Sequence, residues 1–416
     1  MGKLESLKQL KKAYLQQMFP QGGENVPRLR FAGFSEPWEQ RRLGEVTTKI
    51  GSGKTPKGGS AVYLRQGIPF LRSQNITNDA VDLSDVVHIS DEMDIEMSNS
   101  QVQTSDVLLN ITGASIGRSA VYKHTNTANV NQHVCIIRPT EDVNADYLQL
   151  NLTSPNGQQQ IDNNQAGGGR EGLNFQQIAK IAFYFPTLHE QSHIGKFFRA
   201  LDEQIAKQQT IVDRLKRLKA AYLQRMFPQN GETVPRLRFG GFSESWTEVA
   251  LGELGETFTG LSGKTKDDFG KGDARYVVYV NVFSNELATL EGAGKIEVDI
   301  RQNHLKYGDI LFTTSSETPE EVGMSSVWLH HAENVYLNSF CFGFRPTCEI
   351  SSLYMAFMLR SPVVRSKIIL LAQGISRYNI SKTKLMETKV PLPLFNEQTA
   401  IGKFFHTLDN LIKLHN

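Results

Sequence analysis

Apolar residues recur at intervals of three and four along one stretch in the middle of the chain. They are Ile194, Phe198, Leu201, Ile205, Val212, Leu215, Tyr222 and Met226. This heptad spacing is typical of a helix that packs against another helix. The pattern predicts a single helix over residues 187–227, about 58 Å long, which Pro228 ends. Gln208 and Lys219 interrupt the apolar stripe, and we expect Leu218 to cover part of the second gap.

Shorter apolar runs on both sides of this stretch are typical of β-strands. They cover residues 106–112, 133–139, 276–283, 309–314 and 339–346. In the last run, Phe340, Phe342 and Phe344 alternate, which predicts one buried strand face. Helical stretches over 144–152 and 350–360 lie between the strands, so the pattern predicts two compact α+β domains of about 140 residues.

The chain contains an internal sequence repeat. Residues 10–38 and 218–246 are identical at 23 of 29 positions, at a constant offset of 208. A second pair, 190–202 and 397–409, follows at an offset of 207. Repeats of this kind reveal the architecture before any local pattern does. The protein therefore consists of two tandem halves of equal length.

Two long inserts between these blocks, roughly residues 47–185 and 255–392, have diverged strongly. Weak similarity remains, as between 131–139 and 338–346. We therefore expect the inserts to share a fold and to differ in surface. A constant scaffold that carries two variable modules suggests two ligands, or two parts of one ligand.

The second copy of the long helix is split between the two ends of the chain. Its first part is 395–416 and its second part is 1–19, so we expect the termini to lie close together. The expected fold is α+β: two globular domains separated by an antiparallel pair of long coiled-coil helices, with internal pseudo-two-fold symmetry. The expected segments are 1–19, 20–186, 187–227, 228–394 and 395–416.

Composition excludes several classes of protein. The content of 39% hydrophobic and 21% charged residues is that of an ordinary globular protein. Three cysteines are too few for a disulfide framework, which favours a reducing compartment. No apolar run approaches the roughly 20 residues that span a bilayer, and the first residues lack a signal-peptide core. We expect a cytoplasmic protein without membrane contact. The net charge of +2 is low for a protein that binds DNA alone.

Polar loops rich in Gly, Lys, Arg, Asn and Gln separate the strands of both inserts. Glycine lets a backbone approach a ligand closely, cations reach phosphates, and Arg, Asn and Gln pair with base edges. The candidate DNA-binding residues of the first insert are Lys54, Thr55, Lys57, Arg72, Gln74, Asn75, Arg118, Arg170 and Asn174. Those of the second are Lys264, Lys266, Arg275, Ser315, Arg377, Tyr378 and Lys382. The alternative for any one loop is ordinary solvated surface. Two pairs occupy matching places in the diverged inserts: Arg170 with Arg377, and Lys54 with Lys264.

Signals of catalysis are weak. The run GSGKT at 51–55 suggests a phosphate-binding loop, but Thr48 stands where that motif needs its first glycine, and Phe258 stands there in the second half. His330 and His331 lack further metal ligands at a suitable spacing. No methyltransferase or Ser/His/Asp pattern is evident. We expect no catalytic residues, no metal and no cofactor in this chain.

The two scaffold blocks resemble those of one known family. YLQQMFPQ at 14–21, VPRLRFAGF at 26–34 and EQSHIGKFFRALDEQI at 190–205, with their second copies, are similar to the specificity subunits of type I restriction-modification systems. The resemblance spans nearly the whole chain. It implies that 20–186 and 228–394 are target-recognition domains, each reading one half of a split double-stranded DNA target.

The resemblance also implies partners. Two methyltransferase (modification) subunits would supply S-adenosylmethionine chemistry, and restriction subunits would supply translocation driven by ATP and Mg²⁺. The chain departs from the usual family order because its second helix is split, as in a circular permutation. Two other classes remain open: a coiled-coil adaptor that binds proteins, and an enzyme such as an ATPase or a methyltransferase.

Overall fold

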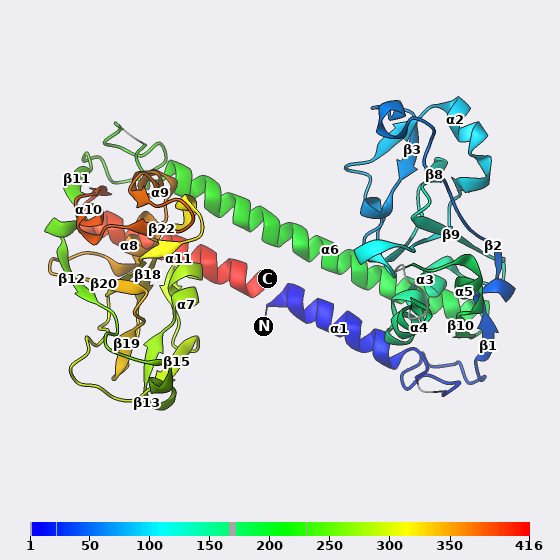
Figure 1. Cartoon of the computed structure of the whole chain (residues 1–416), viewed down its shortest axis with the longest axis horizontal. Helices are drawn as coiled ribbons and strands as arrows, with labels where there is room; N and C mark the ends of the chain where they lie inside the picture. The colour runs from blue at the N-terminus through cyan, green and yellow to red at the C-terminus, as the bar shows by residue number, and fades with distance from the viewer. Residues whose placement is uncertain (1, 22, 166–171, 230) are drawn as a thin grey trace. The chain divides into compact units, whose positions relative to one another are not determined.

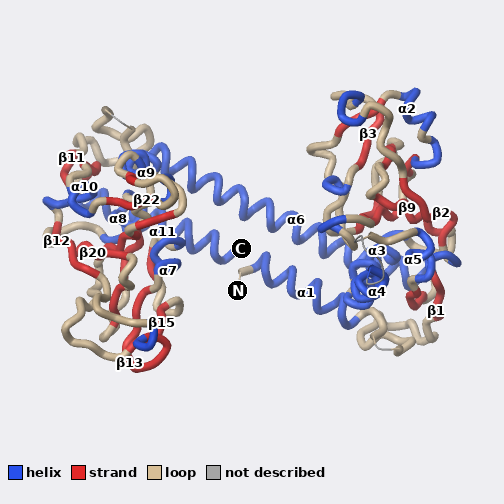
Figure 2. The backbone as a smooth tube through the Cα atoms, viewed as in Figure 1, coloured by secondary structure: helices blue, strands red, loops and turns tan. Residues whose placement is uncertain are grey.

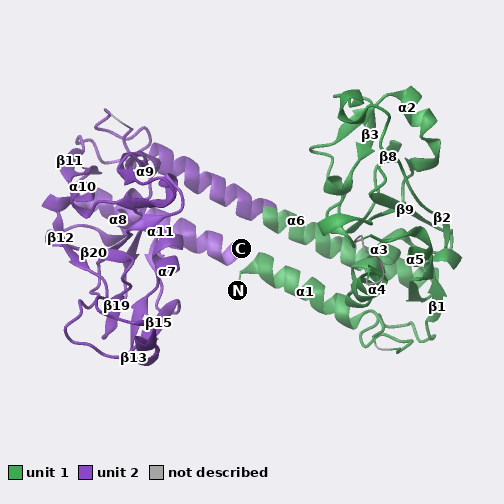
Figure 3. Ribbon diagram, viewed as in Figure 1, with its two compact units in different colours: residues 1–209, 416 green, residues 210–415 purple. Residues whose placement is uncertain are grey.

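The structure is a computed structural model that describes residues 2–21, 23–165, 172–229 and 231–416. The chain divides into two compact units (Figure 3). The first contains residues 1–209 and 416, and the second contains residues 210–415. Both units mix helices with short strands, which confirms the expected mixed class of fold.

The described part of the first unit combines helices with three small sheets (Figures 1 and 2). Its helices are α1 (Lys3–Gln17), α2 (Asp91–Glu96), α3 (Ala145–Thr153), α4 (Pro155–Gln165), α5 (Phe175–Lys180) and the first part of α6 (Leu188–Arg225). Its strands are β1 (Glu39–Arg42), β2 (Thr47–Ser52), β3 (Ile68–Leu71), β4 (Val87–Ile89), β5 (Gln101–Val102), β6 (Val107–Asn110), β7 (Ser119–Val121), β8 (Ala128–Val130), β9 (Val134–Pro139) and β10 (Ala182–Phe185). The strand orders are β2-β9-β6-β7, β4-β3-β8-β5 and β1-β10.

The second unit repeats this plan with a larger central sheet. Its helices, besides the rest of α6, are α7 (Tyr279–Ser284), α8 (Ser352–Met358), α9 (Pro362–Ile369), α10 (Lys382–Met386) and α11 (Phe395–His415). Its strands are β11 (Thr247–Ala250), β12 (Gly255–Thr259), β13 (Phe269–Val277), β14 (Leu287–Ala288), β15 (Ala293–Ile296), β16 (Ile310–Thr313), β17 (Ser315–Ser316), β18 (Ser325–Trp328), β19 (Val335–Leu337), β20 (Cys341–Pro346), β21 (Ala372–Gln373), β22 (Tyr378–Ile380) and β23 (Lys389–Leu392). The strand orders are β12-β20-β16-β18-β14, β15-β13-β19, β17-β22-β21 and β11-β23.

One expected strand is a strand only in part. The run 276–283 gives the end of β13, which stops at Val277, and then the short helix α7. The side chain of Asn281 donates to the carbonyl oxygen of Thr289 at 2.7 Å and accepts from its N–H at 3.0 Å. These bonds hold the chain in a turn. Apolar composition alone does not distinguish such a buried turn of helix from a buried strand.

Helices pack in opposite directions within each unit. In the first unit Tyr14 of α1 meets Phe197 of α6 at 5.0 Å between ring centroids, and Lys11 meets Asp202. In the second unit Tyr222 of α6 meets Phe404 of α11, also at 5.0 Å. Residue numbers rise along α1 as those of its partners fall along α6, so the two helices are antiparallel. The N–H of Glu5 donates to the carbonyl oxygen of Asn416 at 2.9 Å.

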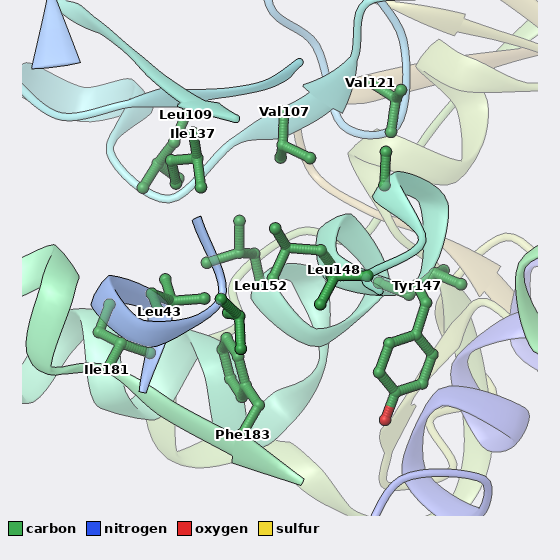
Figure 4. Packing of buried hydrophobic residues seen from close by; sticks show 14 of the residues in the cluster. Leu43, Val107, Leu109, Val121, Ile137, Tyr147, Leu148, Leu152, Ile181 and Phe183 are labelled. Carbon is green, nitrogen blue, oxygen red and sulfur yellow. The ribbon is translucent and has the colours of Figure 1, made fainter. Parts of the chain in front are cut away.

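The helix pair of the first unit shares a core with its sheets. Figure 4 shows Leu109 of β6 and Ile137 of β9 facing Leu148 and Leu152 of α3, with Phe183 of β10 nearby. Residues of the helix pair belong to the same cluster: Met18, Phe19, Ile194 and Phe198. Burying large apolar side chains is the main driving force for packing. The insert is thus anchored to the helices through apolar contact.

The three cysteines differ in accessibility, which gives a simple test of this packing. Burial raises the pKa of the Cys135 and Cys341 thiols to about 12, whereas Cys348 is exposed. Because the thiolate is the reactive form, Ellman's reagent near pH 8 should modify one thiol quickly in the folded chain. All three should react in denaturant. The Cys348→Ser variant should show no fast thiol, and rapid reaction of two or more would contradict the packing.

Candidate nucleic-acid interface

Several loops of the first insert meet at one edge of its sheet. β9 is antiparallel to both β2 and β6, with Ser52 opposite Cys135 and Asn110 opposite Val134. The loops that follow β2 and β6 and the loop that precedes β9 therefore lie together. The side chain of Asn110 donates to the carbonyl oxygen of Ser73 at 2.9 Å, which adds the loop after β3.

Most of the residues predicted for the first insert line this edge. Thr55 donates its hydroxyl to Gln132 at 2.6 Å, which joins the loop after β2 to the loop before β9. Lys54 and Lys57 are exposed in the same loop. Arg118 is exposed, and its carbonyl oxygen accepts the N–H of Asn110 at 2.9 Å. The structure thus brings together cations that are far apart in the sequence.

The loop after β3 holds three further candidates in different states. Gln74 is exposed and donates to the carboxylate of Asp85 at 2.7 Å. Arg72 is half-buried and donates to the carbonyl oxygen of Asp85 at 3.3 Å. Asn75 is only 2% exposed. Its amide closes the turn by accepting from the Arg72 N–H at 3.0 Å and donating to the carbonyl oxygen of Asp82 at 3.0 Å. Asn75 therefore has a structural role within this turn, and its contact with DNA stays a prediction.

Two candidates lie near the end of the first insert. Arg170 lies outside the described residues. The described chain resumes at Gly172, which forms a β-bridge with Thr112 shortly after β6. Asn174 caps α5: its side chain accepts from the N–H of Gln177 at 2.9 Å. It is exposed, but its oxygen is already used by the helix.

The corresponding edge of the second unit forms a groove of about 870 Å³. β17 pairs with β22, so that Ser315 lies opposite Asn379 and Ser316 opposite Tyr378. This pairing brings Arg377 beside the end of β16. Ser315 and Arg377, two predicted residues, line the groove together with Tyr279, Val280, Phe283, Phe340 and two glutamates, Glu317 and Glu321.

The sequence did not predict that apolar side chains line this groove. Val280 is 65% exposed and Phe340 is 59% exposed. Phe340 was expected on the buried face of a strand, but it precedes β20, where its N–H donates to the side chain of Asn338 at 2.9 Å and its carbonyl oxygen accepts from Thr314. The strand therefore begins only at Cys341, and the alternation of buried residues includes Phe342 and Phe344 but not Phe340. Apolar side chains at such positions are suited to contact thymine methyl groups.

Three candidates of the second insert, Lys264, Lys266 and Arg275, lie outside this groove. Lys264 is largely covered and forms an ion pair with Asp299 at 2.9 Å. Hydrogen bonds from Arg301 and Lys264 hold the pKa of Asp299 well below its usual range. Lys266 is exposed in a short 3₁₀ turn and Arg275 is exposed on β13. The structure therefore does not place Lys264 as it places Lys54.

Two further candidates follow Arg377 in the chain. Tyr378 is half-buried at the start of β22, and Lys382 is exposed at the first position of α10. The first edge thus carries exposed cations, Lys54, Lys57 and Arg118, whereas the second combines Arg377 with apolar and acidic side chains. The two edges occupy equivalent places in the fold and differ in chemistry.

The second glycine of the GSGKT run, Gly53, is required by packing. A Cβ atom at Gly53 would fall on the carbonyl oxygen of Val130. At Gly260, the residue that follows β12 as Gly53 follows β2, a Cβ atom would lie 2.1 Å from the carbonyl oxygen of Asn338, against 1.6 Å at Gly53. Within the described ranges, no group of three His, Cys, Asp or Glu side chains is placed to hold a metal. No helix of the described chain is long and apolar enough to cross a membrane.

Comparison with known proteins gives a consistent result. A family model described as Type I restriction modification DNA specificity domain matches residues 35–220 and 243–416. The putative type I restriction enzyme MjaX specificity subunit of Methanocaldococcus jannaschii is 21% identical over 94% of this chain and 91% of its own length. The EcoKI specificity subunit of Escherichia coli is 24% identical over 88% and 81%. The crystal structure of a type I restriction-modification S subunit from M. genitalium has the same fold, with a TM-score of 0.56, 13% identity and 93% of both chains covered.

Proposed function

Because the chain belongs to the type I restriction-modification DNA specificity family, we propose that it reads a bipartite DNA target, one half-site on each unit. As a specificity subunit it is a non-catalytic component of such a complex. The supporting observation is that equivalent sheet edges carry different side chains. The first edge exposes Lys54, Lys57 and Arg118, and the second exposes Arg377 beside Phe340. Unlike surfaces on one fold suit unlike half-sites.

The helices set the length of DNA between the half-sites. In this proposal α6 pairs with α1 and α11 as an antiparallel coiled coil that relates two recognition domains, 20–186 and 228–394, by a pseudo-two-fold axis. Matched contacts within the units support it: the Tyr14–Phe197 pair recurs as Tyr222–Phe404 at the same distance of 5.0 Å. A two-fold arrangement suits two identical partners on a duplex.

The partners are two methyltransferase subunits, joined by restriction subunits in the complete nuclease. S-adenosylmethionine, ATP and Mg²⁺ act in those subunits, in the cytoplasm. The repeated scaffold supports two equivalent docking places. Val26 and Val234 are 38% and 41% exposed, and Leu29 and Leu237 are both 38% exposed. Identical exposed apolar residues in two otherwise diverged units fit one kind of partner bound twice.

The test begins by mapping methylated adenines in the host genome, which reveals both half-sites and the spacer. Gel shifts with the co-expressed methyltransferase subunits then compare Arg377→Ala with Arg118→Ala. Each variant should weaken recognition of one half-site, and a different one, by about 1–3 kcal/mol, or roughly 5- to 150-fold. Equal loss at both half-sites for either variant would contradict the assignment. Absence of any sequence-dependent shift in the wild type would favour a protein-binding adaptor.

A further inference from the structure

Two lysines stand at matching positions inside the helix pairs. Lys11 of α1 and Lys219 of α6 are 208 positions apart, and their side chains are only 11% and 14% exposed. A heptad stripe normally places apolar residues in such positions. Leu218, expected to cover the gap at Lys219, is instead 43% exposed. The lysines are therefore part of the packed interior.

Each lysine holds two carboxylates from two other segments of its unit. Lys11 Nζ lies 2.6 Å from Asp202 of α6 and 2.5 Å from Asp79 of the first insert. Lys219 Nζ lies 2.6 Å from Asp409 of α11 and 2.8 Å from Glu286 of the second insert. We call these sets of three the lysine clusters. Each joins both helices of a pair to the insert that they carry.

The acidic residue contributed by the insert is the informative member. Asp79 and Glu286 are 207 positions apart, the same offset as Asp202 and Asp409. The inserts have diverged almost everywhere else, and yet both place a carboxylate here. The reading edges do not need this carboxylate, because it faces the helices and not the groove. A shared requirement for how an insert meets its helices explains it.

Each insert carboxylate sits on a firmly held turn. The second oxygen of Asp79 accepts from the side chain of Gln149 at 2.8 Å, and the Asp79 N–H donates to Ser119 at 3.0 Å. The carbonyl oxygen of Glu286 accepts from Val327 of β18 at 2.9 Å. Because each carboxylate is held by its insert in this way, its ion pair with the lysine restricts how the insert can be oriented on the helices.

The lysines of these clusters are largely buried and their carboxylates are half-buried, and a partly buried ionic cluster is a poor means of gaining stability. The free energy lost when charged groups leave water is about as large as the free energy gained from their attraction. Apolar residues of similar volume therefore often stabilise the fold equally well or better. In each lysine cluster one lysine holds two carboxylates. What a directional cluster adds over an apolar contact is a defined geometry, as a buried polar residue does in setting coiled-coil register.

We propose that the two lysine clusters are orientation locks that fix the angle of each insert against its helix pair, so that the complex accepts a single spacer length. Lys11 and Lys219 are thus positioning residues for DNA reading. The use of the lock in spacer selection rests on the function proposed above. The lock itself is a property of each unit and is testable without DNA.

The first test measures orientation and stability separately in the whole chain. Lys11→Met leaves two half-buried carboxylates without their cation and should lower the urea midpoint of the first unit by up to roughly 1 M. The triple variant Lys11→Met, Asp79→Leu, Asp202→Leu should recover the wild-type midpoint. Lys12→Met, at the exposed neighbouring position, is the matched control and should change neither property.

Orientation is read from spin labels at Glu96→Cys on α2 and Glu203→Cys on α6, in a Cys348→Ser background. The triple variant should broaden the distance distribution to about twice the wild-type width while remaining folded. A distribution as narrow as that of the wild type would overturn the lock.

The second test varies the spacer by one base pair in gel shifts of the complex with its methyltransferase subunits. The wild type should bind the correct spacer at least about tenfold better than its neighbours, and the triple variant should lose this preference. A broadened distribution with unchanged spacer preference would overturn the proposal. If the labels broaden as expected but the wild type reads no bipartite target, the failure lies in the proposed function and the lock stands.

Discussion

Replacing Arg238 with methionine is expected to lower the free energy of unfolding of the second unit by about 3–5 kcal/mol. Arg238 Nε and Nη2 lie 2.6 and 2.7 Å from the carboxylate oxygens of Glu397, a residue that is only 1% exposed. The hydrogen bonds to Glu397 raise the pKa of Arg238. Methionine keeps the apolar stem of the side chain and removes the cation, so the carboxylate remains buried without its partner.

A neighbouring arginine provides the matched control. Arg236 is 65% exposed and pairs with Glu232 in an i,i+4 arrangement at 3.0 Å. Pairs of this kind contribute at most about 1 kcal/mol, so Arg236→Met should have little effect. Native-state hydrogen exchange of the α8 and α11 amides measures the loss in the second unit alone. Equal losses of stability for the two variants would show that the Arg238–Glu397 ion pair contributes no more to the second unit than an exposed pair does.

The same prediction applies to the first unit, where Arg30 Nε lies 2.6 Å from Glu190, which is also 1% exposed. Arg30→Met should destabilise the first unit and Arg28→Met, at a 70% exposed position, should not. The paired Glu190→Leu substitution should restore much of the lost stability, because no buried charge then remains. Failure of that rescue would assign the effect to lost packing.

The long helix and the duplication could be read from the sequence because their signals are local or repeated. Heptad spacing indicated a helix over 187–227, and α6 spans Leu188–Arg225. The role of Lys219 could not be read in this way. Its partner Glu286 lies 67 positions away, so a pattern along one helix shows only a gap. The periodicity of residues along one helix gives no information about contacts with segments that are distant in the sequence.

The candidate interface shows the same division. Exposed Lys54, Lys57 and Arg118 followed from loop composition, and strand pairing then brought their loops to one edge. Asn75 lies in an equally polar loop, but its side-chain amide is hydrogen-bonded to the backbone of Arg72 and Asp82. The exposed Phe340 was assigned to the core because alternation does not reveal where a strand begins. Residue type indicates what chemistry a loop can perform, and the fold decides which side chains are free to perform it.

Gly53→Ala is expected to destabilise the first unit by about 3 kcal/mol and to displace the loop that carries Lys54 and Thr55. The new methyl group would fall on the backbone oxygen of Val130, which cannot move aside as a flexible side chain can. Gly51, two residues earlier and within β2, has nothing within 4 Å of the corresponding position. Gly51→Ala should therefore be neutral or stabilising by about 0.4–1 kcal/mol.

Urea unfolding and hydrogen exchange of the β2 and β9 amides would compare the two glycine variants, and gel shifts would follow each half-site. Gly53→Ala should weaken reading of the first half-site and leave the second unchanged, because the displaced loop belongs to the first edge only. The close approach recurs at Gly260 against Asn338, so Gly260→Ala should produce the converse pattern. If Gly53→Ala behaved like Gly51→Ala, close backbone packing would not be what positions the loop, and a direct role of the glycine at the DNA would have to be considered instead.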